Sequence, residues 1–487
     1  RRFSTIMTSS LLDVIAVLEE FLVDLLNFGG SGVTHLLCAC RTSHHKFICS
    51  QRFAASRFGI EAHEFQIYAE ELRAAGLGGA ALALHFLQHL QRRLEGGDRG
   101  LVAACRHVIT WSSERVFCFG MNEDGRLGLG DLTDRWQPEE VSWPSNRPQV
   151  VQGSCGGGHS VLVDVEGGAW TCGIDDGRLG RSEAEARADA PEICPHFRRI
   201  DAFWRDRIRI RSVSCGWSFS LFLSDMGSVF TSPREAPLDT PVIGVPTRKE
   251  GLECVVQVSA GNFHALALTD TNYVFSWGSN QEGQCLPGMS PIVDASLAKL
   301  VALRSLLQSF GDLVAGVSAG GSHSLAWTES GRLFTWGSNR WGQLGLPAEH
   351  DNLVPACGAV KTASAGNLTT LFLIAEGDVY GMGRNNEGQL ASSEFAGRGV
   401  RAPMKVLEHR KNGPHVIQVC AGRGCSFFVL NDGSLAACGC GYNGRLGIGS
   451  SENVYRPVIV PGLQLQTARL KAWDACSRRG ECIPDDE

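Results

Sequence analysis

Short runs of alternating apolar and polar residues recur through most of this chain. Residues 323–328 read HSLAWT, a turn of sequence ESG follows, and a second run, RLFTWG, comes after it. Two such runs joined by a glycine-containing turn predict a β-hairpin. Proline-containing stretches between successive hairpins leave room for two further strands. We therefore expect a structural unit of four strands.

This unit recurs, with equivalent positions 45 to 60 residues apart. Its glycine-rich half, FTWGSNRWGQLGL at 334–346, has counterparts at 117–130, 170–180, 275–288, 379–390 and 436–449. The units align at seven positions: His107, His159, Phe219, His264, His323, Thr369 and Ser426. Seven four-stranded units predict an all-β seven-bladed β-propeller over residues 101–487. Because the first unit is incomplete at its front, residues 456–473 are expected to help close the ring.

The recurring glycines are interpreted as structural, because glycine adopts left-handed backbone conformations in tight turns and permits close packing where blades meet. They are Gly120, Gly125, Gly278, Gly283, Gly337, Gly342, Gly383, Gly388, Gly439 and Gly444. His107, His159, His264 and His323 are also interpreted as structural. A catalytic histidine needs one special set of partners, which four equivalent copies cannot all have. We expect these imidazoles to hydrogen-bond neighbouring backbone.

The stretch AGGSHSLAWTESGRLFTWGSNRWGQLGL resembles the repeat of the regulator of chromosome condensation family, whose fold is a seven-bladed propeller. The resemblance covers residues 101–465, and several motifs recur together in the same order. The third unit departs from the pattern, because no second glycine motif follows GSVF at 227–230. The outer part of that blade is therefore not predicted.

The first hundred residues show helical rather than alternating spacing. Apolar residues in SLLDVIAVLEEFLVDLLNF recur every three to four positions, and further helices are expected near 33–48 and 80–94. Residues 1–95 are predicted to form a small α-helical domain, and EGGDRG marks a linker at 96–100. This domain loosely resembles an F-box, which docks a ubiquitin-ligase adaptor. The matching residues are Leu12, Val14, Leu18, Leu22, Leu37, Cys40 and Arg41. A helical cap on the propeller is the alternative.

Composition and charge narrow the functional classes. The formal net charge of -6 argues against a general affinity for nucleic acids. The sequence contains no run of eighteen uncharged apolar residues, so no membrane span is predicted. The 18 cysteines show no paired spacing, which favours a reducing compartment, in the cytoplasm or nucleus. The chain starts at Arg1, which favours truncation; the end of a cleaved mitochondrial transit peptide is the alternative.

No motif for metal binding, cofactor binding or catalysis is convincing. Cys38, Cys40, His44, His45 and Cys49 in CACRTSHHKFIC lack the two closely spaced ligand pairs of a zinc site. Phosphate-binding loops, nucleophile elbows and His-Glu-x-x-His runs do not occur. We therefore predict a protein that is not an enzyme and holds no cofactor.

Two functions remain. The first is a non-catalytic scaffold that presents propeller loops to a protein partner; one form of it is the substrate receptor of a ubiquitin ligase, which residues 1–100 would dock to the adaptor. The alternative, implied by the resemblance, is nucleotide exchange on a small GTPase. Light sensing, another function within this fold, needs repeated GW-x-HT motifs, and only GWSFS at 216–220 comes near. Arg340 and Trp341 are the candidate partner-binding residues, because the other glycine turns carry mostly polar pairs there.

Overall fold

A computed structural model describes most of the chain after residue 101. The described residues are 102–112, 115–143, 147–181, 193–232, 245–285, 292–299, 312–346, 353–355, 357–394, 399–409 and 413–465. The chain divides into two units, Arg1–Glu95 and Gly96–Glu487, and all described residues belong to the second. The predicted helical domain, its F-box-like residues and the cysteine–histidine cluster at 38–49 lie outside the described residues.

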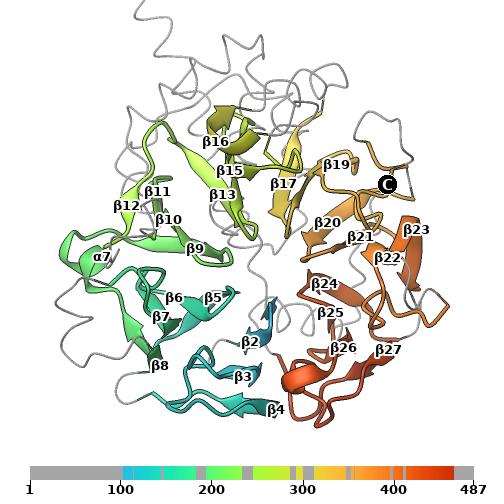
Figure 1. Cartoon of the computed structure of the whole chain (residues 1–487), viewed down its shortest axis with the longest axis horizontal. Helices are drawn as coiled ribbons and strands as arrows, with labels where there is room; N and C mark the ends of the chain where they lie inside the picture. The colour runs from blue at the N-terminus through green and yellow to red at the C-terminus, as the bar shows by residue number, and fades with distance from the viewer. Residues whose placement is uncertain are drawn as a thin grey trace, which may run out of the picture. The chain divides into compact units, whose positions relative to one another are not determined.

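Seven antiparallel sheets are arranged around a central axis, so the predicted seven-bladed β-propeller is confirmed (Figure 1). Blades 1 to 7 follow one another in chain order, and each consists of consecutive strands. The innermost strands are β1 Val102–Ala104, β5 Val150–Cys155, β9 Ile210–Cys215, β13 Val255–Ala260, β17 Val314–Ala319, β20 Val360–Ala365 and β24 Val416–Ala421. The second strands are β2 His107–Trp111, β6 His159–Asp164, β10 Ser220–Ser224, β14 His264–Thr269, β18 His323–Thr328, β21 Thr369–Ile374 and β25 Cys425–Leu430.

The outer half of each blade varies more. The third strands are β3 Val116–Gly120, β7 Ala169–Ile174, β11 Val229–Thr231, β15 Val274–Asn280, β19 Leu333–Gly337, β22 Val379–Arg384 and β26 Leu435–Gly439. The outermost strands are β4 Arg135–Glu140, β8 Ile193–Arg199, β12 Thr247–Arg248, β16 Ile292–Lys299, β23 Gly399–Leu407 and β27 Val454–Ile459. In its described part blade 5 has three strands instead of the expected four, with an isolated bridge from Phe334 to Leu353. The unpredicted outer strand of blade 3, β12, is two residues long.

The second strand of each blade is buried on both faces, because a neighbouring blade packs against each of them. In β18 all six residues of HSLAWT are buried, so its polar members Ser324 and Thr328 face protein rather than water. The outermost strand β27 shows mostly partial or full exposure instead. The apolar and polar residues that alternate along a second strand are therefore all buried, and the alternation does not mark a solvent-exposed face.

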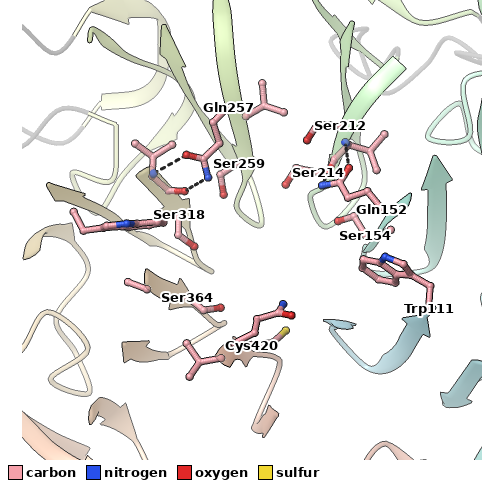
Figure 2. A pocket seen from close by; sticks show the side chains of 18 residues that line it. Trp111, Gln152, Ser154, Ser212, Ser214, Gln257, Ser259, Ser318, Ser364 and Cys420 are labelled. Carbon is pink, nitrogen blue, oxygen red and sulfur yellow. Dashed lines mark hydrogen bonds between the residues drawn. The ribbon is translucent and has the colours of Figure 1, made fainter. Parts of the chain in front are cut away.

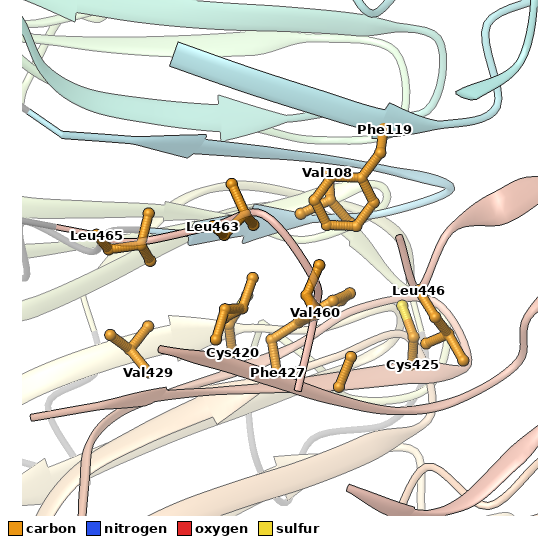
Figure 3. Close-up of a cluster of buried hydrophobic side chains, with 12 residues drawn as sticks. Val108, Phe119, Cys420, Cys425, Phe427, Val429, Leu446, Val460, Leu463 and Leu465 are labelled. Carbon is orange, nitrogen blue, oxygen red and sulfur yellow. The ribbon is translucent and has the colours of Figure 1, made fainter. Parts of the chain in front are cut away.

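The hydrophobic core consists of seven clusters, each between two consecutive blades. The cluster that closes the ring joins blade 7 to blade 1 (Figure 3). In it Val108 and Phe119 of blade 1 pack with Phe427 of blade 7, and the rings of Phe119 and Phe427 meet edge to face at 6.2 Å. Val460, Leu463 and Leu465, which follow β27, belong to the same cluster.

The premise that blade 1 is incomplete at its front is wrong, whereas the segment after β27 does pack where the ring closes. The front of blade 1 is complete, because β1 pairs with β2 through Val102–Thr110 and Ala104–Val108. The described part of the segment after β27, residues 460–465, contributes no strand to blade 1, and its apolar side chains join the cluster between the first and last blades. Closure among the described residues therefore depends on side-chain packing rather than on strand exchange.

Replacement of Leu465 by alanine should weaken this closure. Leu465 is 1% exposed, and removal of its buried side chain should lower the free energy of unfolding by about 2 kcal/mol. Ile459, which is 51% exposed on β27, provides the matched control, and Ile459→Ala should change stability by less than about 0.5 kcal/mol. Urea denaturation of both variants measures the difference, and equal stabilities would contradict the packing role of this segment.

Candidate protein-binding face

Two sets of connections emerge on one side of the propeller. Since neighbouring strands are antiparallel, the loop from first to second strand and the turn from third to fourth strand leave each blade on the same side. We call this side the loop face. Its inner loops include 156–158, 216–219, 261–263, 320–322, 366–368 and 422–424, and its glycine turns include 121–128, 175–180, 279–285, 338–345, 384–391 and 440–447.

The glycines singled out from the sequence all have positive φ. Those at the ends of third strands are Gly120, Gly278, Gly337, Gly383 and Gly439, and those within the turns are Gly125, Gly283, Gly342, Gly388 and Gly444. A Cβ on Gly342 would lie 2.6 Å from the Cα of Arg401 and 2.7 Å from the carbonyl oxygen of Val400 in the next blade. This turn therefore packs backbone to backbone against a neighbouring outer strand.

The histidines connect neighbouring blades through the hydroxyl groups of Ser and Thr side chains. The sequence had predicted hydrogen bonds to neighbouring backbone instead. Nε2 of His264 lies 2.9 Å from Oγ of Ser324, whose hydroxyl donates to the carbonyl of Gln284 at 2.8 Å. Because the hydroxyl proton is used in that second bond, Nε2 of the imidazole is the donor of the first. The other pairs are His107–Ser160 at 2.6 Å, His159–Ser220 at 2.8 Å and His323–Thr370 at 3.0 Å.

Burial keeps these four imidazoles neutral. The pKa of His107 lies well below its usual value, and burial lowers the pKa of His159 and His264 to about 3 and that of His323 to about 4. An imidazole with such a low pKa, enclosed between blades, is not available as an acid or base to a bound molecule.

In the seventh blade Cys425, not Ser426, occupies the position equivalent to these histidines, because Cys425 pairs with Gly439.

The first strands surround a polar central channel (Figure 2). Serines on five of them accept hydrogen bonds from backbone amides of the following blade, which would otherwise lack partners at a sheet edge. The pairs are Ser154–Cys215, Ser214–Ala260, Ser259–Ala319, Ser318–Ala365 and Ser364–Ala421, at 2.9 to 3.0 Å. Gln152 and Gln257 each bridge to the next blade in the same way. These hydrogen bonds join neighbouring blades around the channel, which contains a hollow of about 170 Å³.

Arg340 and Trp341 lie in the glycine turn of blade 5, on the loop face. Arg340 is exposed, whereas Trp341 is half-buried and its ring lies 5.4 Å from the guanidinium carbon of Arg384 in blade 6. Trp341 therefore combines a contact with the neighbouring blade and an accessible surface.

Two further aromatic residues on the loop face were missed in the sequence. Phe263 in the inner loop of blade 4 is 55% exposed, and Tyr442 in the glycine turn of blade 7 is 64% exposed. Comparison between repeats could have found Phe263, because four of its six equivalents, Gly158, Ser218, Ser322 and Gly424, are small and none is aromatic. Aromatic and arginine side chains together have the composition of protein-binding hot spots.

Within the described residues, the side chains and helices do not meet the requirements of a metal site or of a helical membrane span. No group of three or more His, Cys, Asp or Glu side chains that could hold a metal ion is present there. The same residues include no helix that is long and apolar enough to cross a bilayer. The described strands define a seven-bladed β-propeller whose inner loops and glycine turns emerge on one face.

Comparison with known proteins identifies the family. Residues 115–477 match the family model described as RCC1-like domain, and the chain belongs to this family. Human HERC4, a probable E3 ubiquitin-protein ligase, is 32% identical over 394 residues, which are 76% of this chain and 34% of HERC4. The chain thus spans about a third of that relative's length.

Two other relatives match over most of their own length. The ultraviolet-B receptor UVR8 of Arabidopsis thaliana is 27% identical, with 79% of this chain and 89% of the receptor covered. The mouse secretion-regulating guanine nucleotide exchange factor is 30% identical, with 75% and 83% covered. The crystal structure of Prp20p from Saccharomyces cerevisiae superposes with a TM-score of 0.59 at 20% identity, covering 77% of this chain and 96% of Prp20p, which supports the fold alone.

Proposed function

We propose that this protein is a non-catalytic scaffold that binds a protein partner through the loop face of its propeller. The observation that carries the proposal is the pair of exposed Arg340 and half-buried Trp341, which lies on a turn where the other repeats have mostly polar residues. Phe263 and Tyr442 extend the aromatic character of the same face. A rigid ring that displays side chains on loops is well suited to recognition of a protein surface.

The backbone of this turn is held by contacts that do not involve the side chains of Arg340 or Trp341. The amide of Trp341 donates to Oε1 of Gln343 at 2.9 Å, and the amide of Leu344 donates to Oδ1 of Asn339 at 3.1 Å. The turn of blade 6 has the same two bonds, Glu387 to Gln389 at 3.0 Å and Leu390 to Asn385 at 2.8 Å. Side chains can therefore be exchanged between the two turns with their geometry retained.

A swap of the two residues tests the proposal. Arg340→Asn with Trp341→Glu copies the pair Asn386–Glu387 of blade 6 and should preserve the melting temperature within a few degrees. Partner affinity should fall by about 2 kcal/mol, roughly thirtyfold, in a pull-down or titration with the captured partner. Met226→Ala is the control, since Met226 is 50% exposed on a turn of the opposite side. Unchanged affinity of the folded swap variant would refute the role of this pair.

Two narrower functions are supported by relatives. A mouse relative bears the name of a guanine nucleotide exchange factor, which favours exchange on a small GTPase as the alternative. HERC4 bears the name of a ubiquitin ligase, which favours a role as a substrate receptor, with residues 1–100 docking the adaptor. Identification of the captured partner separates them. Faster release of labelled GDP from a captured GTPase would support exchange, and recovery of a ligase adaptor would support the receptor function.

A further inference from the structure

The inner loops converge at the mouth of the channel on the loop face. Backbone hydrogen bonds connect most of them around the ring: Gly157–Trp217, Trp217–Asn262, Asn262–Gly320, Gly321–Gly366, Asn367–Gly422 and Arg423–Cys105, at 3.1 to 3.4 Å. Across the mouth, the side chain of Asn262 donates to that of Asn367 at 2.8 Å. A hollow of about 80 Å³ remains between these loops, large enough for one side-chain head group and water.

Trp217 of blade 3 lies over this mouth toward the first and last blades. It passes Gly157 of blade 2, where a Cβ would meet the indole Cδ2 at 2.8 Å. The absence of a side chain at Gly157 therefore makes room for the indole. The ring then lies 4.9 Å from the guanidinium carbon of Arg106 in blade 1 and 4.5 Å from that of Arg423 in blade 7.

A cation–π contact with an indole supplies no acceptor oxygen to a guanidinium, so the N–H groups at its edge stay available for a ligand. The N–H groups at that edge form the planar fork that binds a carboxylate through two parallel hydrogen bonds. Trp217 thus holds the guanidiniums of Arg106 and Arg423 at one place without consuming their donors. Both arginines and the tryptophan are partly exposed, so a ligand can reach them from the loop face.

The charge at this place is not balanced within the described part of the chain. Three other loop-face arginines have carboxylate partners: Arg126 pairs with Asp124, Arg178 with Asp176 and Arg384 with Glu387. No ion pair of Arg106 or Arg423 is found among the described residues. Burial, followed by the charges of Arg106, Arg445 and Arg384, lowers the pKa of Arg423. An anion bound beside these guanidiniums would relieve their mutual repulsion.

We propose that the channel mouth is a binding site for a carboxylate on an acidic segment of a protein partner. Arg106 and Arg423 hold the carboxylate by their guanidinium edges, beside the ring of Trp217. The side chains of Asn262 and Asn367, which bond to each other, line the same hollow as Trp217 and Arg423. This inference rests on the proposed scaffold function and names the partner chemistry at the centre of its face.

Binding of short peptides to the full chain tests the site directly. Fluorescein-labelled hexaglutamate should bind in low-salt buffer, and hexaglutamine should not. Arg106→Gln with Arg423→Gln should weaken hexaglutamate binding by about tenfold or more, because two charge-assisted contacts are lost. Arg205→Gln with Arg207→Gln removes the same charge from exposed positions elsewhere and should alter binding less than about twofold. Equal weakening by both double variants would overturn the site.

Three further measurements separate loss of the site from loss of folding, from a preference for phosphate and from failure of the scaffold function. Arg423→Lys retains the charge but loses the planar fork, so it should still weaken binding several-fold while its melting temperature stays near that of the wild type. Stronger binding of a phosphoserine peptide than of hexaglutamate would show that phosphate is the preferred anion and would overturn the carboxylate assignment. A chain that binds its partner through Arg340–Trp341 but not hexaglutamate would refute this site and leave the scaffold function intact.

Discussion

Stability should fall steeply as the pH drops from 7 to 5, although few carboxylates protonate in that range. The cause is the set of buried histidines His107, His159, His264 and His323. Their folded-state pKa values are depressed by burial, whereas an unfolded chain binds protons with a pKa near 6.5. Below that pH the unfolded state takes up protons that the folded state cannot accept, so unfolding becomes more favourable.

The expected size of this effect is large. Each histidine contributes up to about 1.4 kcal/mol per pH unit between pH 6.5 and its folded pKa. Four of them amount to at most about 8 kcal/mol at pH 5, comparable to the whole stability of many domains. Urea denaturation at pH 7, 6 and 5 measures the change. A free energy of unfolding that stays constant over this range would contradict the neutral, buried state of these imidazoles.

The propeller itself supplies a control for the acid effect. Blade 3 carries Phe219 at the histidine position, and blade 4 carries Ala265 where blades 2, 3, 5, 6 and 7 have a hydroxyl. His264→Phe with Ser324→Ala therefore copies a pair that already works between two blades. This variant should fold at pH 7 and lose about a quarter of the acid sensitivity. An unchanged pH dependence would assign the effect to other groups.

The second large effect is expected for Gly342→Val, which should lower the free energy of unfolding by about 3 to 5 kcal/mol. The valine would have to adopt a φ near +86°, which β-branched residues tolerate poorly. Its Cβ would also overlap the backbone of Val400 and Arg401, which cannot move without shifting β23. Both causes act at the junction of blades 5 and 6.

Gly462 separates the two causes. It also has a positive φ, +74°, but no atom lies within 4 Å of the position that a Cβ would occupy. Gly462→Val should therefore cost only about 1 to 2 kcal/mol, from the backbone conformation alone. Comparison of both variants by urea denaturation isolates the contribution of blade packing. Equal losses would mean that the turn of Gly342 contributes nothing to the contact between blades.

The number of blades and their inner hairpins could be predicted because the contacts that form them are local. His323 pairs with Gly337, only a short distance along the chain, and the same spacing recurs in each unit. The contacts between blades also follow a pattern in the sequence, but the two residues that meet belong to consecutive units. A histidine in one blade meets Ser or Thr in the next, whereas Phe219 precedes Ala265 and Cys425 precedes Val108. Alignment of Ser426 with the histidines concealed this relation.

Features that depend on ring closure could not be read from the repeat. Trp217, Arg106 and Arg423 come from blades 3, 1 and 7, and their meeting depends on the curvature of the whole ring. Packing of Leu465 against blade 1 likewise has no counterpart within a single unit. The glycine turn did indicate Arg340 and Trp341 as unusual, but the contact of Trp341 with Arg384 required the position of the next blade.

Hydrogen–deuterium exchange with the captured partner tests the central claim, recognition through the loop face, most directly. Bound partner should slow exchange in Asn262–Phe263, Asn339–Gly342 and Gly441–Gly444. Exchange in turns of the opposite side, such as 165–168 and 225–227, should stay unchanged. Slower exchange confined to those opposite turns, with the loop face unaffected, would contradict the account.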